Sequence, residues 1–150
     1  MADSHQKPGL SQDAAITLAL AGTSVPHAAS VEAEAERWLR VMRLHGEVGC
    51  TLQALGVGEA PLASAAEPRA IRLLKARPLG EDIVEMVSDR AHAFASERDA
   101  RLVSSVDILF ALLEVYGEDL DRALYVRGTS REELLECLAA RASRRAETHV

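Results

Sequence analysis

Residues 103–134, VSSVDILFALLEVYGEDLDRALYVRGTSREEL, decide the fold of this chain. Ser104 or Ser105 can cap a helix that continues through an almost wholly apolar stretch to Gly117. A helix that is apolar on every side is typical of a buried position. A short amphipathic helix follows and ends at Gly128, because glycine is the usual residue just after a helix C-terminus. We therefore expect a central buried helix with a shorter helix beside it.

Helical signals continue on both sides of this stretch. Ser30 is placed to cap VEAEAERWLRVMRLH, and the phase of Trp38 with its apolar neighbours favours a core position over an exposed hot-spot role. Apolar residues from Ile83 to Ala95 recur at helical spacing. Thr129 and Glu132 fit a capping box that opens a last helix. With aromatic residues at only 3% and few strand-forming residues, the composition favours an all-α fold.

An internal repeat relates the two halves of the chain. WLRVMRLHGEVGCTLQALGVGEAPL (38–62) and ILFALLEVYGEDLDRALYVRGTSREEL (108–134) share one order. Each has an apolar helix, a Gly-Glu turn, a short helix with leucine in phase and a closing glycine. Two such units, each with an open apolar face, are expected to pair pseudo-symmetrically. The sequence thus predicts two pseudo-symmetric four-helix repeats packed as one compact bundle.

The expected domain organisation follows from the repeat and from shifts in composition. A stretch rich in Gly, Ala, Pro and Ser after Gly58 indicates a linker. The expected segments are a flexible N-terminal tail (1–10), a helical domain (11–140) made of repeat 1 (about 11–65), a linker (about 58–78) and repeat 2 (about 79–140), and a flexible C-terminal tail (141–150).

Charge and hydropathy argue against several kinds of partner. The formal net charge is −6, and no basic stripe is visible, so we expect no nucleic-acid binding. No apolar run approaches the roughly 18 residues of a membrane span, and Met1–Leu10 lacks the apolar segment of a secretory signal. Cys50 and Cys137 stand outside any CxxC pattern and are expected as reduced thiols, with Cys50 buried. We expect a cytoplasmic protein without membrane contact.

Motifs for catalysis or metal binding are missing from the sequence. His27, His45 and His92 lie on different elements without metal-ligand spacing. No GxSxG motif and no GxxxxGK[ST] phosphate loop occurs. Cys50 lies in an apolar helical phase, which does not favour a reactive thiolate. We therefore expect no enzyme activity, no catalytic residues, no metal and no cofactor.

The second half of the chain resembles a known family, the N-terminal (Clp N) domain of Clp-type AAA+ unfoldases. The resemblance rests on PLGEDIVEMVSDRAHAF (78–94) and continues without a gap over 103–134; it is weaker over 35–57, where GEVGCTLQALGVG is the best part. It implies an all-α double repeat that binds proteins. Since the phosphate loop is missing, we expect a free-standing Clp N-like domain without ATPase modules.

The resemblance also implies where a partner binds. Some family members hold phosphorylated arginine or adaptor proteins with the Glu of a Thr-Glu-His motif in each repeat. In the first repeat that Glu corresponds to Glu34 or Glu36, with apolar phasing in favour of Glu36. In the second repeat the Glu and His positions hold Val106 and Asp107, so half of that chemistry is missing.

Two further features remain open to more than one interpretation. Glu32, Glu34 and Glu36 can form a solvated helix start, which the helix dipole favours, or a docking surface for basic partners. Tyr116 and Tyr125 can pack with a solvated hydroxyl or line a groove between the repeats. The candidate protein-binding residues are Glu34, Glu36, Val106, Asp107 and Tyr116.

The expected function is non-catalytic protein binding in a Clp chaperone–protease system. The chain would act as an adaptor, accessory or substrate-recognition factor whose partner is a Clp ATPase, a Clp peptidase or a substrate polypeptide. The alternative is a regulatory interaction protein that reuses the same scaffold outside proteolysis, for example with a transcription factor. Fold-level resemblance alone does not decide between them.

Overall fold

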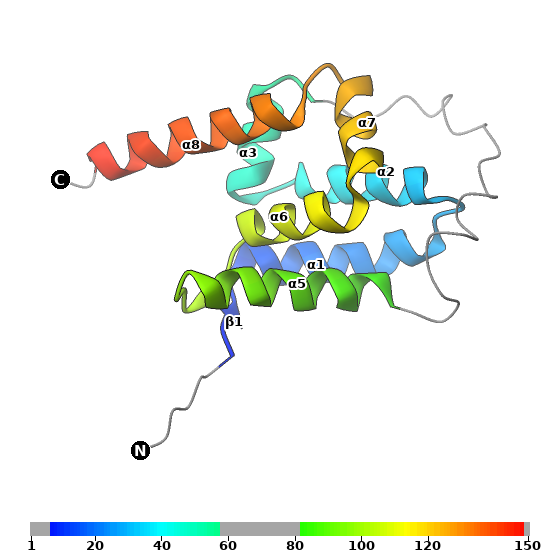
Figure 1. Cartoon of the computed structure of the whole chain (residues 1–150), viewed down its shortest axis with the longest axis horizontal. Helices are drawn as coiled ribbons and strands as arrows, with labels where there is room; N and C mark the ends of the chain where they lie inside the picture. Colours follow the sequence, from blue (N-terminus) through cyan, green and yellow to red (C-terminus); the bar gives the residue numbers. More distant parts are fainter. Residues whose placement is uncertain (1–6, 58–81, 149–150) are drawn as a thin grey trace.

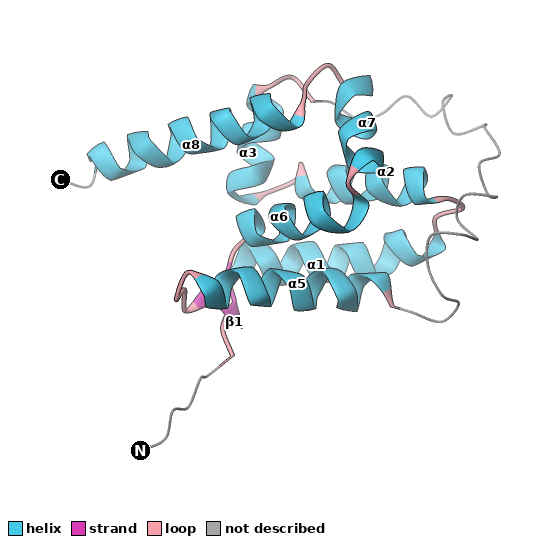
Figure 2. Cartoon of the chain, viewed as in Figure 1, coloured by secondary structure: helices cyan, strands magenta, loops and turns pink. Residues whose placement is uncertain are grey.

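Helices carry nearly all of the described chain. The structure is a computed structural model that describes residues 7–57 and 82–148. A 3-10 helix, η1 (Val25–His27), directly follows the first α-helix. The mostly helical architecture expected from the sequence is confirmed (Figures 1 and 2). Within the described ranges the α-helices are α1 (Gln12–Ser24), α2 (Val31–Met42), α3 (Gly46–Ala54), α5 (Ile83–Glu97), α6 (Ser105–Tyr116), α7 (Glu118–Val126) and α8 (Arg131–Thr148).

Serine side chains cap the starts of α1, α2 and α6. The hydroxyls of Ser11 and Ser30 each accept a backbone N–H from three residues later, at 3.1 and 3.0 Å. Ser104 begins α6 in a capping box with Asp107. These contacts satisfy N–H groups that the first helical turn leaves unpaired. The cap predicted at Ser30 is confirmed, and of the two serines proposed for α6 it is Ser104 that caps the helix.

Glycines end the two short helices in the same way. Gly56 after α3 has φ +81°, and Gly128 after α7 has φ +87°. In both turns the residue after the glycine donates its N–H five residues back: Val57 to the Leu52 carbonyl at 3.0 Å and Thr129 to Leu124 at 3.1 Å. This is the Schellman pattern, and it favours glycine because the left-handed conformation strains other residues.

The capping box predicted for α8 is wrong. Ser130, and not Thr129, accepts the N–H of Glu133, at 3.1 Å. Thr129 is 4% exposed, and its N–H closes the end of α7. Because Thr129 belongs to the turn that ends α7, the next residue, Ser130, caps α8.

Helix α6 lies at the centre of the molecule, as the sequence predicts (Figure 1). Helices α1, α2, α3, α5 and α7 all pack against it. The phenyl ring of Phe110 is the main apolar side chain that α6 leaves exposed, at 39%. The buried residues of α6 are Ser105, Asp107, Ile108, Leu109, Ala111, Leu112, Leu113 and Tyr116.

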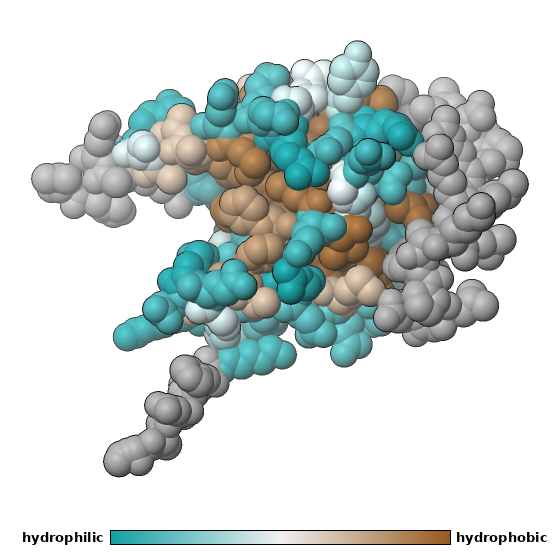
Figure 3. All heavy atoms as spheres, viewed as in Figure 1, coloured by the Kyte–Doolittle hydropathy of each residue, from teal (hydrophilic) through white to brown (hydrophobic). Residues whose placement is uncertain are grey.

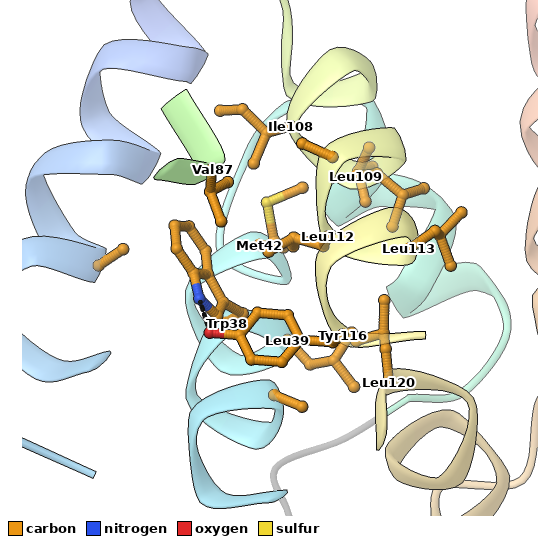
Figure 4. Packing of buried hydrophobic residues seen from close by; sticks show 14 of the residues in the cluster. Trp38, Leu39, Met42, Val87, Ile108, Leu109, Leu112, Leu113, Tyr116 and Leu120 are labelled. Atoms are coloured by element: carbon orange, nitrogen blue, oxygen red, sulfur yellow. Dashed lines mark hydrogen bonds between the residues drawn. The ribbon is translucent and has the colours of Figure 1, made fainter. Parts of the chain in front are cut away.

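One hydrophobic core joins residues from both halves of the chain. Trp38 of α2 is 0% exposed, so its predicted core position is confirmed. Its indole lies between Val87 of α5 and Tyr116 of α6, while Met42 lies beside Leu112 (Figure 4). The two halves therefore share their interior.

A strictly all-α fold was expected, and the structure corrects this at one point. Strands β1 (Gly9–Leu10) and β2 (Leu102–Val103) pair in parallel. The Ser11 N–H donates to the Val103 carbonyl at 2.9 Å, and the Gly9 N–H to the Arg101 carbonyl at 3.1 Å. Two residues per strand are too short to show alternating hydropathy, which is why the sequence gave no sign of them.

The chain ends also differ from the expected tails. Gly9 and Leu10, placed in the tail 1–10, belong to β1. Helix α8 continues to Thr148, through most of the expected tail 141–150. The expected linker at about 58–78 lies outside the described residues. The structure thus extends the helical domain at its C-terminal side.

Two further observations bear on the chemistry of the surface. Cys50 is exposed, which corrects the expectation of a buried thiol, and Cys137 is half-buried; both are free. Within helix α3, Val48 and Leu52 take the inward positions, so Cys50 falls on the outer side. None of the helices in the described ranges is long and apolar enough to cross a bilayer.

Candidate functional site

Glu34 and Tyr116, two of the predicted site residues, meet in the interior. The Tyr116 hydroxyl donates to Glu34 Oε1 at 2.7 Å. It also accepts the indole N–H of Trp38 at 2.9 Å, the bond that Figure 4 draws. Glu34 is 4% exposed and Tyr116 6%. The three side chains form a hydrogen-bonded chain between α2 and the last residue of α6. In this position the three side chains hold the two helices together.

Glu36 lies at the contact between α2 and α7. Its Oε2 accepts from Arg127 Nη2 at 2.8 Å, and the Arg127 side chain is only 5% exposed. Burial lowers the pKa of Arg127; the carboxylate of Glu36 opposes this shift, and the charges of Arg40 and Arg43 add to it. Glu36 is therefore occupied by an internal ion pair.

The acidic run at the start of α2 is neither a solvated helix end nor an open acidic surface. Glu34 is buried, Glu36 pairs with Arg127, and Glu32 accepts from Arg122 Nη1 at 3.1 Å. Two of the three carboxylates thus bind arginines of α7, the helix packed across α2, or of its C-terminal cap.

Asp107 caps the N-terminal end of α6. Its side chain is 1% exposed, accepts the Ser104 N–H at 2.9 Å and forms a two-point ion pair with Arg98. The hydrogen bonds that Arg98 donates to the Asp107 carboxylate raise the pKa of Arg98. Asp107 is thus held by the protein itself, and the sequence signal that could have shown this is its place three residues after a serine cap.

Val106 borders an exposed apolar surface that was not expected from the sequence. It is half-buried against the core, one helical turn before the exposed Phe110. The rings of Phe110 and Phe94 lie with centroids 6.0 Å apart, tilted by 48°. Beside them, Arg90 of α5 lies over the Phe94 ring at 5.3 Å and donates through Nε to Glu114 at 2.7 Å.

We call Phe94, Val106 and Phe110, with the Arg90–Glu114 pair, the α5–α6 surface. Helices α5 and α6 pack closely, and four-residue steps place these side chains on one side of the pair. Apolar side chains gather along α6 in the notch between α8 and α5 (Figure 3). Aromatic ring faces with a charged rim are suited to hold an apolar side chain of another protein.

A clue to this surface was present in the sequence. A helix apolar at almost every position cannot turn every side chain inward when neighbours cover only part of it. Phe110 is the large apolar residue of α6 that its neighbours leave exposed. The sequence could show the excess of apolar residues, but not which of them faces outward.

The described residues gather no cluster of three or more His, Cys, Asp or Glu side chains suited to a metal ion. No protein-family model, curated protein or solved structure matches the chain. The candidate site is accordingly defined by the geometry of the α5–α6 surface.

Proposed function

We propose that the chain is a Clp N-like protein-binding module that engages a Clp chaperone–protease system as an adaptor, accessory or substrate-recognition factor. The observation that carries this proposal is the exposed Phe110, supported by Phe94 and flanked by the Arg90–Glu114 pair. Well-supported aromatic residues of this kind dominate the energy of many protein interfaces. Binding would be non-covalent, without turnover of the partner.

The order of helices supports the Clp N resemblance. Helices α2 and α6 both have 12 residues, and α3 and α7 both have nine. A glycine with positive φ stands at the start of each short helix. Gly46 (φ +80°) is the first residue of α3, and Gly117 (φ +52°) directly precedes α7. Matched lengths and turns are what the double repeat of that family would require, and we propose this relation for the two halves.

Affinity capture tests the proposal. The full chain is immobilised, bound proteins are identified, and the experiment is repeated with Phe110→Arg. We expect the unchanged chain to recover a Clp ATPase or peptidase and the variant to lose it. The reason is that the variant places a charge where the partner would bury the Phe110 ring.

Ile16→Arg is the matched control, since Ile16 is 40% exposed on α1. Far-UV circular dichroism checks that both variants keep their helices. Recovery of one other partner, with no Clp component, would favour the regulatory protein outside proteolysis. Capture that is equal for both variants would contradict the role of the α5–α6 surface.

A further inference from the structure

The rim of the α5–α6 surface already holds a guanidinium. Arg90 lies over the Phe94 ring, with its Cζ 5.3 Å from the ring centroid. Its Nε donates to Glu114 Oε2 at 2.7 Å, and its Nη2 lies 2.5 Å from the same oxygen. A guanidinium is attracted to an aromatic ring face, and a carboxylate beside the ring accepts its N–H groups. Ring and carboxylate thus bind the same cation within the chain itself.

A second ring and a second carboxylate oxygen are present at the same place. Phe110 is 39% exposed, with its ring centroid 6.0 Å from that of Phe94. Glu114 follows one helical turn after Phe110, on the same side of α6. Its side chain is 50% exposed, and both contacts of Arg90 end on Oε2, so Oε1 accepts no hydrogen bond from the described residues. A carboxylate can accept at both of its oxygens.

The charges on α5 and α6 favour a cation at this surface. Two of their carboxylates, Asp107 and Glu114, are paired with arginines of the chain. Glu97 is a further carboxylate on the Phe94 side of α5, three residues along, and it is exposed. The carboxylates of α5 and α6 are Glu85, Asp89, Glu97, Asp107 and Glu114, against one arginine within the two helices, Arg90. A positively charged partner is therefore complementary to these helices.

Arginine is the side chain that fits both groups at once. Its planar guanidinium can stack on a ring while its edge donates to a carboxylate, whereas the ammonium of lysine is a point charge. Its methylene stem still gives the apolar contact that the surface offers. An apolar side chain alone would cover Glu114 without giving Oε1 a donor, which is costly for a carboxylate.

We infer that the α5–α6 surface recognises an arginine side chain of its protein partner, with the guanidinium over the Phe110 ring and donating to Glu114 Oε1. This inference rests on the proposed function, because it names the partner chemistry of the same surface. The contact of Arg90 with Phe94 and Glu114 shows the arrangement that the incoming arginine repeats.

A peptide of defined composition tests the inference. The probe is a short fluorescein-labelled peptide of glycine and leucine with one central arginine, and its binding to the full chain is measured by fluorescence anisotropy. We expect saturable binding, which weakens about tenfold when citrulline, the uncharged analogue, replaces the arginine. The peptide with lysine should also bind more weakly, since an ammonium cannot stack and form the same bonds. An intermolecular NOE between the arginine side chain and the Phe110 ring reports the contact itself.

Two variants of the protein separate the ring from the carboxylate. Phe110→Leu keeps an apolar side chain and removes the ring, and Glu114→Gln removes the charge. We expect each variant to weaken binding of the arginine peptide about tenfold and binding of the citrulline peptide much less. Glu133→Gln is the matched control, because it removes one exposed carboxylate of α8 and should leave both affinities unchanged. Circular dichroism checks that the variants keep their helices.

The outcomes separate this inference from the proposed function. Equal affinity for the arginine and citrulline peptides, equal loss in Glu114→Gln and Glu133→Gln, or no binding of the arginine peptide would overturn the inference. If Phe110→Arg then still abolishes capture of a Clp component, the proposed function stands and only the preference for arginine is wrong. If the arginine peptide binds as expected and no Clp component is captured, the proposed partner is wrong and the arginine site stands.

Discussion

Tyr116 links two residues that lie far from it in the sequence. Its hydroxyl donates to Glu34 and accepts from Trp38, so one oxygen satisfies two buried polar groups of α2. Buried polar groups are costly when they lose their partners, because water cannot replace the lost bond. At the scale of single residues, this hydrogen-bonded chain fixes α2 against α6.

Removing that oxygen should destabilise the protein. In Tyr116→Phe we expect the free energy of unfolding, measured by urea titration, to fall by about 1–3 kcal/mol, since Trp38 and Glu34 each lose a bond in the interior. Tyr125→Phe is the control, as Tyr125 is 79% exposed, and it should change stability by less than about 0.5 kcal/mol. Equal effects of the two variants would contradict the structural role of Tyr116.

The sequence showed the chemistry of these residues but not their partners. The spacing of Glu32, Glu34 and Glu36 left a solvated helix start and a docking surface open. The structure instead places Glu34 in the interior and pairs the other two with arginines of α7 and its end. Their partners lie about 90 residues later in the sequence, and helical periodicity carries no information at that distance.

At the scale of elements, α3 approaches the end of α2 unusually closely. A Cβ atom on Gly49 would lie 2.8 Å from the Met42 carbonyl oxygen and 3.0 Å from that of Arg43. Both atoms belong to the backbone and cannot turn aside. Glycine at position 49 therefore sets the distance between the two helices.

Two glycine substitutions should act in opposite directions. We expect Gly49→Ala to lower the free energy of unfolding by about 1–3 kcal/mol through overpacking. Gly22→Ala, in α1 with nothing within 4 Å of the new Cβ, should raise it by about 0.5–1 kcal/mol through the better helix propensity of alanine. Thermal unfolding followed by circular dichroism measures both, and a stabilised Gly49→Ala would contradict the close approach.

Helix starts and stops were the part of the fold that the sequence predicted best. Ser30, Ser104 and Gly128 act as expected because capping depends on near neighbours. The error at Thr129 shows the limit of that reasoning: two adjacent residues can cap, and the preceding turn decides between them.

At the scale of the whole molecule, both halves contribute to one core. Trp38, from the first half, lies against α5 and α6 of the second half (Figure 4). The pairing of β1 with β2 also joins the two halves. Such long-range contacts could not be predicted beyond the general expectation that two apolar faces pack together.

A shared core predicts a single unfolding transition. Trp38 is the chain's one tryptophan, so its fluorescence reports on the interior while circular dichroism reports on all helices. We expect the two urea curves to coincide. Leu112→Ala in α6 should lower the free energy of unfolding obtained from each curve by the same amount, about 2–5 kcal/mol. A circular dichroism curve with two transitions, only one of which coincides with the change in Trp38 fluorescence, would contradict a common core.

The most direct measurement of the central proposal is the affinity between the purified chain and the purified Clp ATPase and peptidase of the same cell. We predict saturable binding to one of them, which Phe110→Arg weakens about tenfold or more, equivalent to about 1.4 kcal/mol, and which Ile16→Arg leaves unchanged. Absence of binding to both proteins, with all variants folded, would contradict the account.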